Sequence, residues 1–276
     1  MRAAQTAKAD PRVSPSLDED SVAGGKPIKI GAITVDSISL EDASRLIRLR
    51  ASERKGSSVH LVNAYTVALA EHDESYAECV NDGWLNLADG RPLQWLSRFR
   101  GDEQRLEQIR GIDLFHRVLA DGRDENLKHF FLGSTEEARE RMASKLQERY
   151  GSIEIAGSES PPFRDLTSDE QSDQAKRIRE SGAQVIWVGL GTPKQDAEIE
   201  LLASEVDAVC IGVGAAFALA AGDQWYVPEW VSILGLEWLS RLVQEPKRLW
   251  RRYLGGNLIF LGVVIKDLTS RGSRTR

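Results

Sequence analysis

The stretch that most constrains the fold covers residues 185–217 and reads VIWVGLGTPKQDAEIELLASEVDAVCIGVGAAF. VIWVGL is a short, continuous apolar run, which is typical of a strand buried on both faces of a parallel sheet. Pro193, in the turn that follows, is suited to the first position of a helix. VCIGVG then repeats the strand pattern. Two successive strand–loop–helix units predict an α/β sheet, in which ligands bind beyond the carboxyl ends of the strands.

Similar apolar runs recur along the chain, in VHLV, WLNLA, HFFLG and IEIAG. Each is followed by a loop or a helical pattern, so we predict a Rossmann-like, mostly parallel sheet flanked by helices over residues 27–230. Residues 1–26 lack periodicity and an apolar core, which predicts a disordered tail without a secretory signal. We expect a basic, amphipathic, membrane-proximal helical appendage over 231–265 and a flexible tail over 266–276.

The C-terminal segment differs in charge from the rest of the chain. Residues 236–276 carry nine Lys and Arg against three Asp and Glu, a net charge of +6, which leaves −12 for the preceding residues. Such a basic end suits an anionic partner (phosphates, a lipid surface or nucleic acid) or is a solvated tail. Pro246 predicts a new helix after a break. LIFLGVVI is too short to span a bilayer and is predicted to lie in a membrane interface or against the core.

Several loops at predicted strand ends carry polar side chains. Asn63 follows the strand VHLV, where it either binds a ligand or caps a helix that we expect to continue through Val80. Asp89 precedes Gly90 on another strand-to-helix loop, as a general base or as an ordinary turn residue. Gly111 and Asp113 mark a further helix start. From the residues alone, both alternatives stay open for Asn63 and for Asp89.

Common cofactor and metal motifs are missing from the sequence. The two glycine loops contain GxG, but Lys194 and Phe217 occupy the position of the third glycine of a dinucleotide fingerprint. There is no GxxxxGK[ST] loop and no GxSxG elbow. The four histidines are scattered and no cysteine pair has zinc spacing. We therefore predict neither a metal nor a cofactor.

Taken in order, the loops resemble one known set. NAYT, ADG, RGID, FFLG, VGLGTPKQ, IGVGAAF and GLEWLSRLVQEPKRLWRRYL follow one another as in the WecB/TagA/CpsF glycosyltransferases, which form glycosyltransferase family 26. The resemblance covers about residues 28–260. It implies a bacterial, inverting, metal-independent enzyme that moves a sugar from a UDP-sugar to a polyprenyl-diphosphate-linked acceptor. It also implies a cytoplasmic, peripheral protein at the inner face of the plasma membrane, in exopolysaccharide or cell-wall polymer synthesis.

The resemblance also implies roles for individual residues. Asp89 corresponds to the proposed catalytic base, which favours catalysis over the turn interpretation. The expected substrate-binding residues lie in the matched loops and in the C-terminal segment: Asn63, Thr66, Gly90, Gly111, Asp113, Gly191, Thr192, Pro193, Lys194, Gln195, Gly212, Gly214, Ala215, Phe217, Arg241, Arg248, Arg251 and Arg252. The chain departs from the family at Leu61, where a threonine is frequent and Thr66 is a candidate substitute. Two further departures are Ala218, in place of an acidic residue, and Asp196, in place of glutamate.

Several points are left open by the sequence. The resemblance leaves the donor sugar open among N-acetylmannosamine, its uronic acid, glucose and glucuronate. The apolar C-terminal end is predicted to be buried either in lipid or between the subunits of a homo-oligomer. The competing hypotheses are an inactive relative that acts as a scaffold, a nucleotide-dependent oxidoreductase and a nucleic-acid-binding protein. The oxidoreductase lacks the third glycine, and the nucleic-acid hypothesis lacks a motif, so we expect no nucleic-acid partner.

Overall fold

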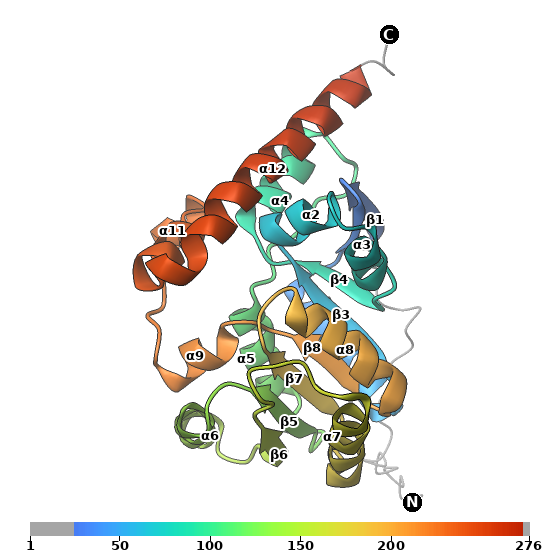
Figure 1. Cartoon of the computed structure of the whole chain (residues 1–276), viewed down its shortest axis with the longest axis vertical. Helices are drawn as coiled ribbons and strands as arrows, with labels where there is room; N and C mark the ends of the chain where they lie inside the picture. The colour runs from blue at the N-terminus through green and yellow to red at the C-terminus, as the bar shows by residue number, and fades with distance from the viewer. Residues whose placement is uncertain (1–24, 273–276) are drawn as a thin grey trace, which may run out of the picture.

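Six parallel strands form the central sheet (Figure 1). The computed structural model of the protein describes residues 25–272, without the side chains of Glu229, Arg248, residues 251–253 and residues 270–272. The strand order is β4-β3-β8-β7-β5-β6. Their bounds are β3 (Ser57–Val62), β4 (Leu85–Ala88), β5 (Lys128–Gly133), β6 (Glu154–Glu159), β7 (Val185–Gly189) and β8 (Val209–Gly212). The predicted Rossmann-like α/β fold is confirmed.

Strand β7 illustrates why the inner strands read as continuous apolar runs. Val185 and Trp187 pack into the hydrophobic cluster on one face of the sheet, and Ile186 and Val188 pack into the cluster on the other. All four side chains are fully buried. Since successive side chains of a strand point to opposite faces, a strand covered on both sides must be apolar at every position.

Helices cover both faces of the sheet. One face packs against α1 (Leu40–Ser52), α5 (Gly111–Asp121), α6 (Glu136–Tyr150) and α9 (Ala216–Ala221). The other packs against α7 (Ser168–Ser181) and α8 (Lys194–Glu205). Ser39, Thr135 and Thr167 accept a backbone hydrogen bond at the start of α1, α6 and α7, as expected of N-cap residues.

An antiparallel hairpin lies beside strand β4. It consists of β1 (Gly25–Ile30) and β2 (Ile33–Ser37). Asn86 of β4 joins it to the sheet, because its backbone N–H donates to Asp36 at 2.7 Å and its side-chain amide donates to the Thr34 carbonyl at 3.1 Å. The hairpin is therefore attached to the core outside the parallel sheet.

The prediction of one continuous helix from Asn63 through Val80 is wrong, because this stretch forms two helices. α2 covers Ala64–Ala70 and α3 covers Glu74–Asn81. Between them Asp73 is in extended conformation and its carboxylate accepts the Tyr76 N–H at 3.0 Å, which starts a new helix. A local cap thus interrupts an apolar pattern that reads continuously through both helices.

The C-terminal segment is helical and packs against one end of the core. It contains α10 (Glu229–Ile233), α11 (Glu237–Gln244) and α12 (Pro246–Gly272), with α4 (Arg91–Phe99) nearby (Figure 1). Phe260 and Val263 of α12 are buried with residues of the hairpin, α2 and α3.

The helix continues beyond residue 265, where the sequence predicted a flexible tail. The predicted tail at 1–26 and the last four residues lie almost entirely outside the described range. Within that range, no helix is long and apolar enough to cross a membrane.

Candidate active site

The polar loops predicted from the sequence converge at one edge of the sheet. Strand β3 lies between β4 and β8, and β8 is paired with β7, so the carboxyl ends of all four strands are adjacent. Asn63 follows β3, and Asp89 and Gly90 follow β4. The two glycine loops follow β7 and β8. The structure therefore brings both groups of predicted residues to the edge where open α/β sheets bind ligands.

Asp89 is held by backbone and side-chain contacts from several elements. Its N–H donates to the Val62 carbonyl at 2.8 Å, and its Oδ1 accepts the Gly111 N–H at 3.1 Å. Gly111 approaches closely because it has no Cβ, which would lie 2.8 Å from a methyl group of Leu61 and 3.1 Å from the Val213 carbonyl. The carboxylate is thus fixed between β3, β4 and the start of α5.

The environment of Asp89 raises its pKa to about 7. Burial is the main cause, since it penalises the charged form, and the negative charge of Glu237 acts in the same direction. The positive charge of Arg241 opposes them, as do hydrogen bonds from the Gly111 N–H and from the Asn63 side chain. An ordinary carboxylate is a weak base, whereas one with a pKa near 7 can both take and hold a proton at neutral pH.

Asn63 turns out to be both a helix cap and a neighbour of Asp89. Its Oδ1 accepts the N–H groups of Tyr65 at 3.0 Å and Thr66 at 3.3 Å, and the Thr66 hydroxyl accepts the Asn63 N–H in return. This capping box fixes the side chain so that it also hydrogen-bonds to Asp89. Thr66 itself is buried, and its hydroxyl is engaged in the cap.

Gln195 joins the two glycine loops to each other. Its Oε1 accepts the Gly191 N–H at 3.1 Å and the Gly214 N–H at 3.0 Å. Both glycines have positive φ, 81° and 55°, which L side chains rarely adopt. At Gly212 a Cβ would lie 3.1 Å from the Gln195 amide nitrogen. Gln195 is buried, so its side chain supports the loops from the interior side.

The remaining predicted loop residues have different surroundings. The Thr192–Pro193 peptide bond is cis, and Lys194 donates to the Arg164 carbonyl at 3.0 Å. Ala215 precedes α9. The Phe217 ring lies in the core, 5.9 Å from the Phe115 ring and 5.8 Å from the Phe131 ring between centroids. The structure does not bring the Phe217 side chain to the loop surface.

A cleft of about 440 Å³ is lined by Arg91, two residues after Asp89, and by Arg110, which precedes the Gly111 that donates to Asp89. Its walls come from α4, α5, the loops before α5 and the segment before α11; the lining residues are Arg91, Gln94, Glu107, Gln108, Arg110, Asp113, Tyr226, Val227 and Ser232. Arg110 donates to the Asp113 carboxylate at 2.5 and 2.9 Å and to Glu237 at 3.4 Å. Asp113 is thus placed at the cleft, in an ion pair.

Among the residues that line the cleft, sequence reasoning predicted only Asp113, and Arg110 and Tyr226 are two of those that it missed. Arg110 occupies the N-cap of α5, where a positive charge is unfavourable unless it is paired, and that position is a signal the sequence offered. The Tyr226 hydroxyl is hydrogen-bonded to His116 Nε2 over 3.1 Å. The Tyr150 hydroxyl is hydrogen-bonded to Nδ1 of the same ring over 2.8 Å. Burial lowers the pKa of His116 to about 4, so the imidazole is neutral. No local pattern links Tyr226 to His116.

The predicted C-terminal arginines are divided between two helices. Arg241 lies on α11, where its charge acts on Asp89. Arg248, Arg251 and Arg252 lie on α12, and their side chains are outside those the structure describes. α11 ends at Gln244, so the four arginines do not share one continuous helix. Among the described residues, no group of three or more His, Cys, Asp or Glu side chains is placed to hold a metal.

The chain matches the model of a known protein family. The family model described as "Glycosyl transferase WecG/TagA/CpsF family" matches residues 28–274, nearly the whole chain. Membership implies a sugar-nucleotide donor and a glycan acceptor. The protein belongs to the WecG/TagA/CpsF family of glycosyltransferases.

Proposed function

We propose that the protein is an inverting, metal-independent transferase that moves a sugar from a UDP-sugar to a polyprenyl-diphosphate-linked glycan, with Asp89 as its catalytic base. The observation that carries this proposal is the environment of Asp89. The carboxylate has a pKa of about 7 and accepts the N–H of Gly111, which follows Arg110 in the wall of a cleft large enough for a sugar ring. The product would contribute to a bacterial exopolysaccharide or cell-wall polymer.

A single in-line displacement accounts for inversion. The acceptor hydroxyl loses its proton to Asp89 while its oxygen attacks the anomeric carbon of the donor. The bond between that carbon and the diphosphate oxygen breaks, and UDP leaves with the electron pair. Asp89 then releases the proton to solvent, for which a pKa of about 7 is well suited.

The charge on the departing diphosphate must be stabilised by groups near the glycine loops. Gln195 already accepts the N–H groups of Gly191 and Gly214, so these two amides support the loops. The amides of the residues that follow them, Thr192 and Ala215, are the candidates for phosphate contacts, together with the first turn of α8. This assigns the loops to the donor and the cleft lined by Arg91 and Arg110 to the acceptor.

The C-terminal arginines are the proposed ligands of the acceptor diphosphate. A guanidinium group donates two parallel hydrogen bonds to phosphate oxygens, which suits it to this role. Arg241 supports the proposal, because its charge reaches Asp89 from α11. We also include three arginines of α12 among these proposed ligands: Arg248, Arg251 and Arg252. We expect truncation after residue 235 to abolish transfer.

The same segment is proposed to hold the enzyme on the inner face of the plasma membrane. Its exposed side chains include Leu254, Leu258, Leu261 and Ile265 of α12. Trp225 and Trp230, at the end of the core just before this segment, are also exposed. Aromatic and aliphatic side chains beside arginines are typical of an interfacial helix. The proposed division of the chain is a catalytic core at 27–230 and a membrane-proximal appendage at 231–265.

The proposal is tested by UDP release. Wild-type protein is incubated with each UDP-sugar and with detergent-solubilised polyprenyl-diphosphate sugars, in the presence of EDTA. We expect one donor to give acceptor-dependent release, reduced at least about 100-fold in Asp89→Asn. Asp124→Asn serves as the matched control, because Asp124 is exposed and lies shortly before the start of β5, at the opposite edge of the sheet. Equal release by wild type and Asp89→Asn would refute the role of Asp89.

A further inference from the structure

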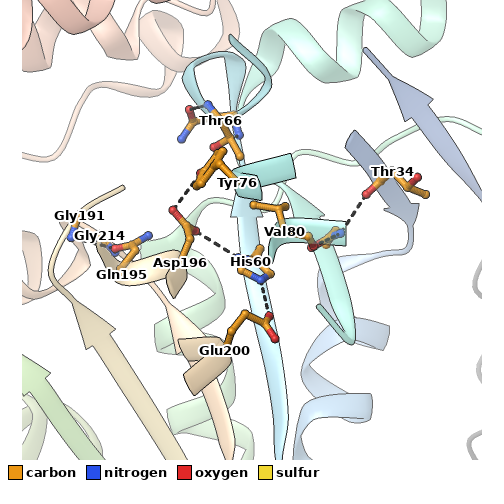
Figure 2. A network of polar contacts seen from close by, with 12 residues as sticks. Thr34, His60, Thr66, Tyr76, Val80, Gly191, Gln195, Asp196, Glu200 and Gly214 are labelled. Atoms are coloured by element: carbon orange, nitrogen blue, oxygen red, sulfur yellow. Dashed lines mark hydrogen bonds and ion pairs between the residues drawn. The ribbon is translucent and has the colours of Figure 1, made fainter. Parts of the chain in front are cut away.

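A buried charged network lies directly behind the glycine loops (Figure 2). His60 of β3 bonds Asp196 through Nδ1 at 3.2 Å and Glu200 through Nε2 at 2.7 Å. The Tyr76 hydroxyl of α3 donates to the second oxygen of Asp196 at 3.0 Å. His60 is fully buried, Asp196 is 2% exposed and Glu200 is 26% exposed. The network therefore connects a central strand with two helices in the interior.

The geometry of the network is fixed from several sides. Asp196 and Glu200 are four residues apart, so they lie on one face of α8 and hold the two nitrogens of the same imidazole. Gly83 lies against the ring, and a Cβ there would come within 2.5 Å of the His60 Cδ2 atom. Consequently the ring has one orientation, and α8 has one rotation about its axis that satisfies both carboxylates.

Such a network is a poor way to gain stability. Transferring charged groups into the interior costs several kcal/mol for each ion, and apolar residues of equal volume are frequently as stable. A buried ion pair can instead fix one arrangement of the elements that it joins. The question is then which part of the protein depends on the position of α8.

The two glycine loops depend on the position of α8, because the first turn of this helix contacts both of them. Asp196 follows Gln195 directly, and Gln195 holds the amides of Gly191 and Gly214. In Figure 2 the Gln195 side chain points toward the glycines and the Asp196 side chain points the other way, toward Tyr76 and His60. A rotation of α8 that broke the Asp196 contacts would also withdraw Gln195 from the two loops.

We propose that Asp196, held by His60 and Tyr76, is a positioning residue for the donor site: it sets the rotation of α8 so that Gln195 can hold the two glycine loops in their phosphate-binding form. This inference rests on the proposed function, because it takes the loops as the site of the UDP moiety. It assigns a role to residues that touch neither the cleft nor Asp89. Loss of the network should weaken donor binding and leave the proton transfer at Asp89 intact.

The test is a double-mutant cycle on UDP affinity, measured by calorimetry on folded protein. We expect Asp196→Asn and Gln195→Ala each to weaken UDP binding about tenfold, as is typical of coupled neighbours. Because both act through the same contact, the combined variant should bind UDP no more weakly than Gln195→Ala alone. Glu205→Gln, an exposed acidic residue at the end of the same helix, should leave the affinity unchanged.

Tyr76→Phe is the milder variant, because it removes one hydroxyl and keeps the ring in the core. It should fold as wild type and weaken UDP binding in the same direction, by a smaller factor. Unchanged affinity in folded Asp196→Asn or Tyr76→Phe, or losses that simply add in the combined variant, would overturn the inference. Absence of UDP binding by the wild type would instead refute the proposed function, and the inference with it.

Discussion

At the scale of single residues, the account depends on how the protein sets the pKa of Asp89. Burial raises it, and two charged side chains of α11 act on it in opposite directions. Arg241 lowers the pKa and Glu237 raises it. Since both belong to the C-terminal segment, the position of that segment influences the pKa of Asp89.

This arrangement predicts opposite pH shifts in two variants. Arg241→Gln removes a positive charge and should move the acid limb of the kcat/KM profile to higher pH. Glu237→Gln removes a negative charge and should move the limb to lower pH. Arg117→Gln, which breaks an exposed ion pair with Asp121 elsewhere on α5, is the control and should cause no shift. Shifts in the same direction for both α11 variants would contradict the assignment.

Sequence reasoning predicted Asp89 and Arg241 as site residues, but it did not predict Glu237 or Arg110. Asp89 and Asn63 could be predicted because they lie in short motifs at strand ends, which converge in any parallel sheet. Arg110 was missed although its partner Asp113 belongs to the same RGID motif; its contact with Glu237 joins residues 127 positions apart and leaves no local sign. Asn63 shows that a cap and a site residue can be the same side chain.

At the scale of elements, the buried network makes the attachment of α8 to β3 depend on pH. Burial opposes a charge on His60, but hydrogen bonds and charges of Asp196 and Glu200 overcome it and raise the pKa above its ordinary value of 6.5. Tyr76 and Cys79 of α3 also face these carboxylates. A histidine whose pKa is raised by folding contributes stability below its unfolded pKa.

We therefore predict that the network stabilises the fold most below pH 6.5. The contribution should be fully present there and decline as the pH rises through the raised pKa of His60. The measurement is the unfolding free energy of wild type and His60→Gln between pH 5.5 and 9. Their difference should shrink toward high pH. A difference that stays constant or grows with pH would show that His60 is not charged in the folded protein.

The elements themselves were predictable to different degrees. Inner strands such as β7 were found because burial on both faces leaves only apolar residues. The division between α2 and α3 was not, since it depends on one Asp73 cap within a periodic pattern. The contact between β3 and α8 through His60 and Asp196 joins residues 136 positions apart, and a single sequence carries no local sign of it.

At the scale of the whole molecule, α12 has an inner and an outer face. Phe260 and Val263 are buried against the hairpin and α2, and Gly256 lies against the Tyr65 ring. Leu258 and Leu261 are 71% and 53% exposed. The sequence left LIFLGVVI either in an interface or against the core, and the structure divides its residues between the core and an exposed face.

The two faces predict two separable effects. Phe260→Ala should lower the free energy of unfolding by about 3 kcal/mol, because it empties a buried site. Leu258→Glu with Leu261→Glu should change the unfolding free energy little and weaken binding to phosphatidylglycerol vesicles about tenfold. Ser172→Glu on α7 is the control for added charge. Vesicle binding that is unaffected by the double substitution would remove this face from the membrane contact.

The measurement that tests the central claim most directly is the pH dependence of kcat/KM for the wild-type enzyme. If Asp89 is the base, activity should rise about tenfold per pH unit up to a pKa of about 7 and level off above it. The residual activity of Asp89→Asn should lack this limb. A wild-type profile that is flat between pH 5.5 and 8, or a limb that persists in Asp89→Asn, would contradict the account.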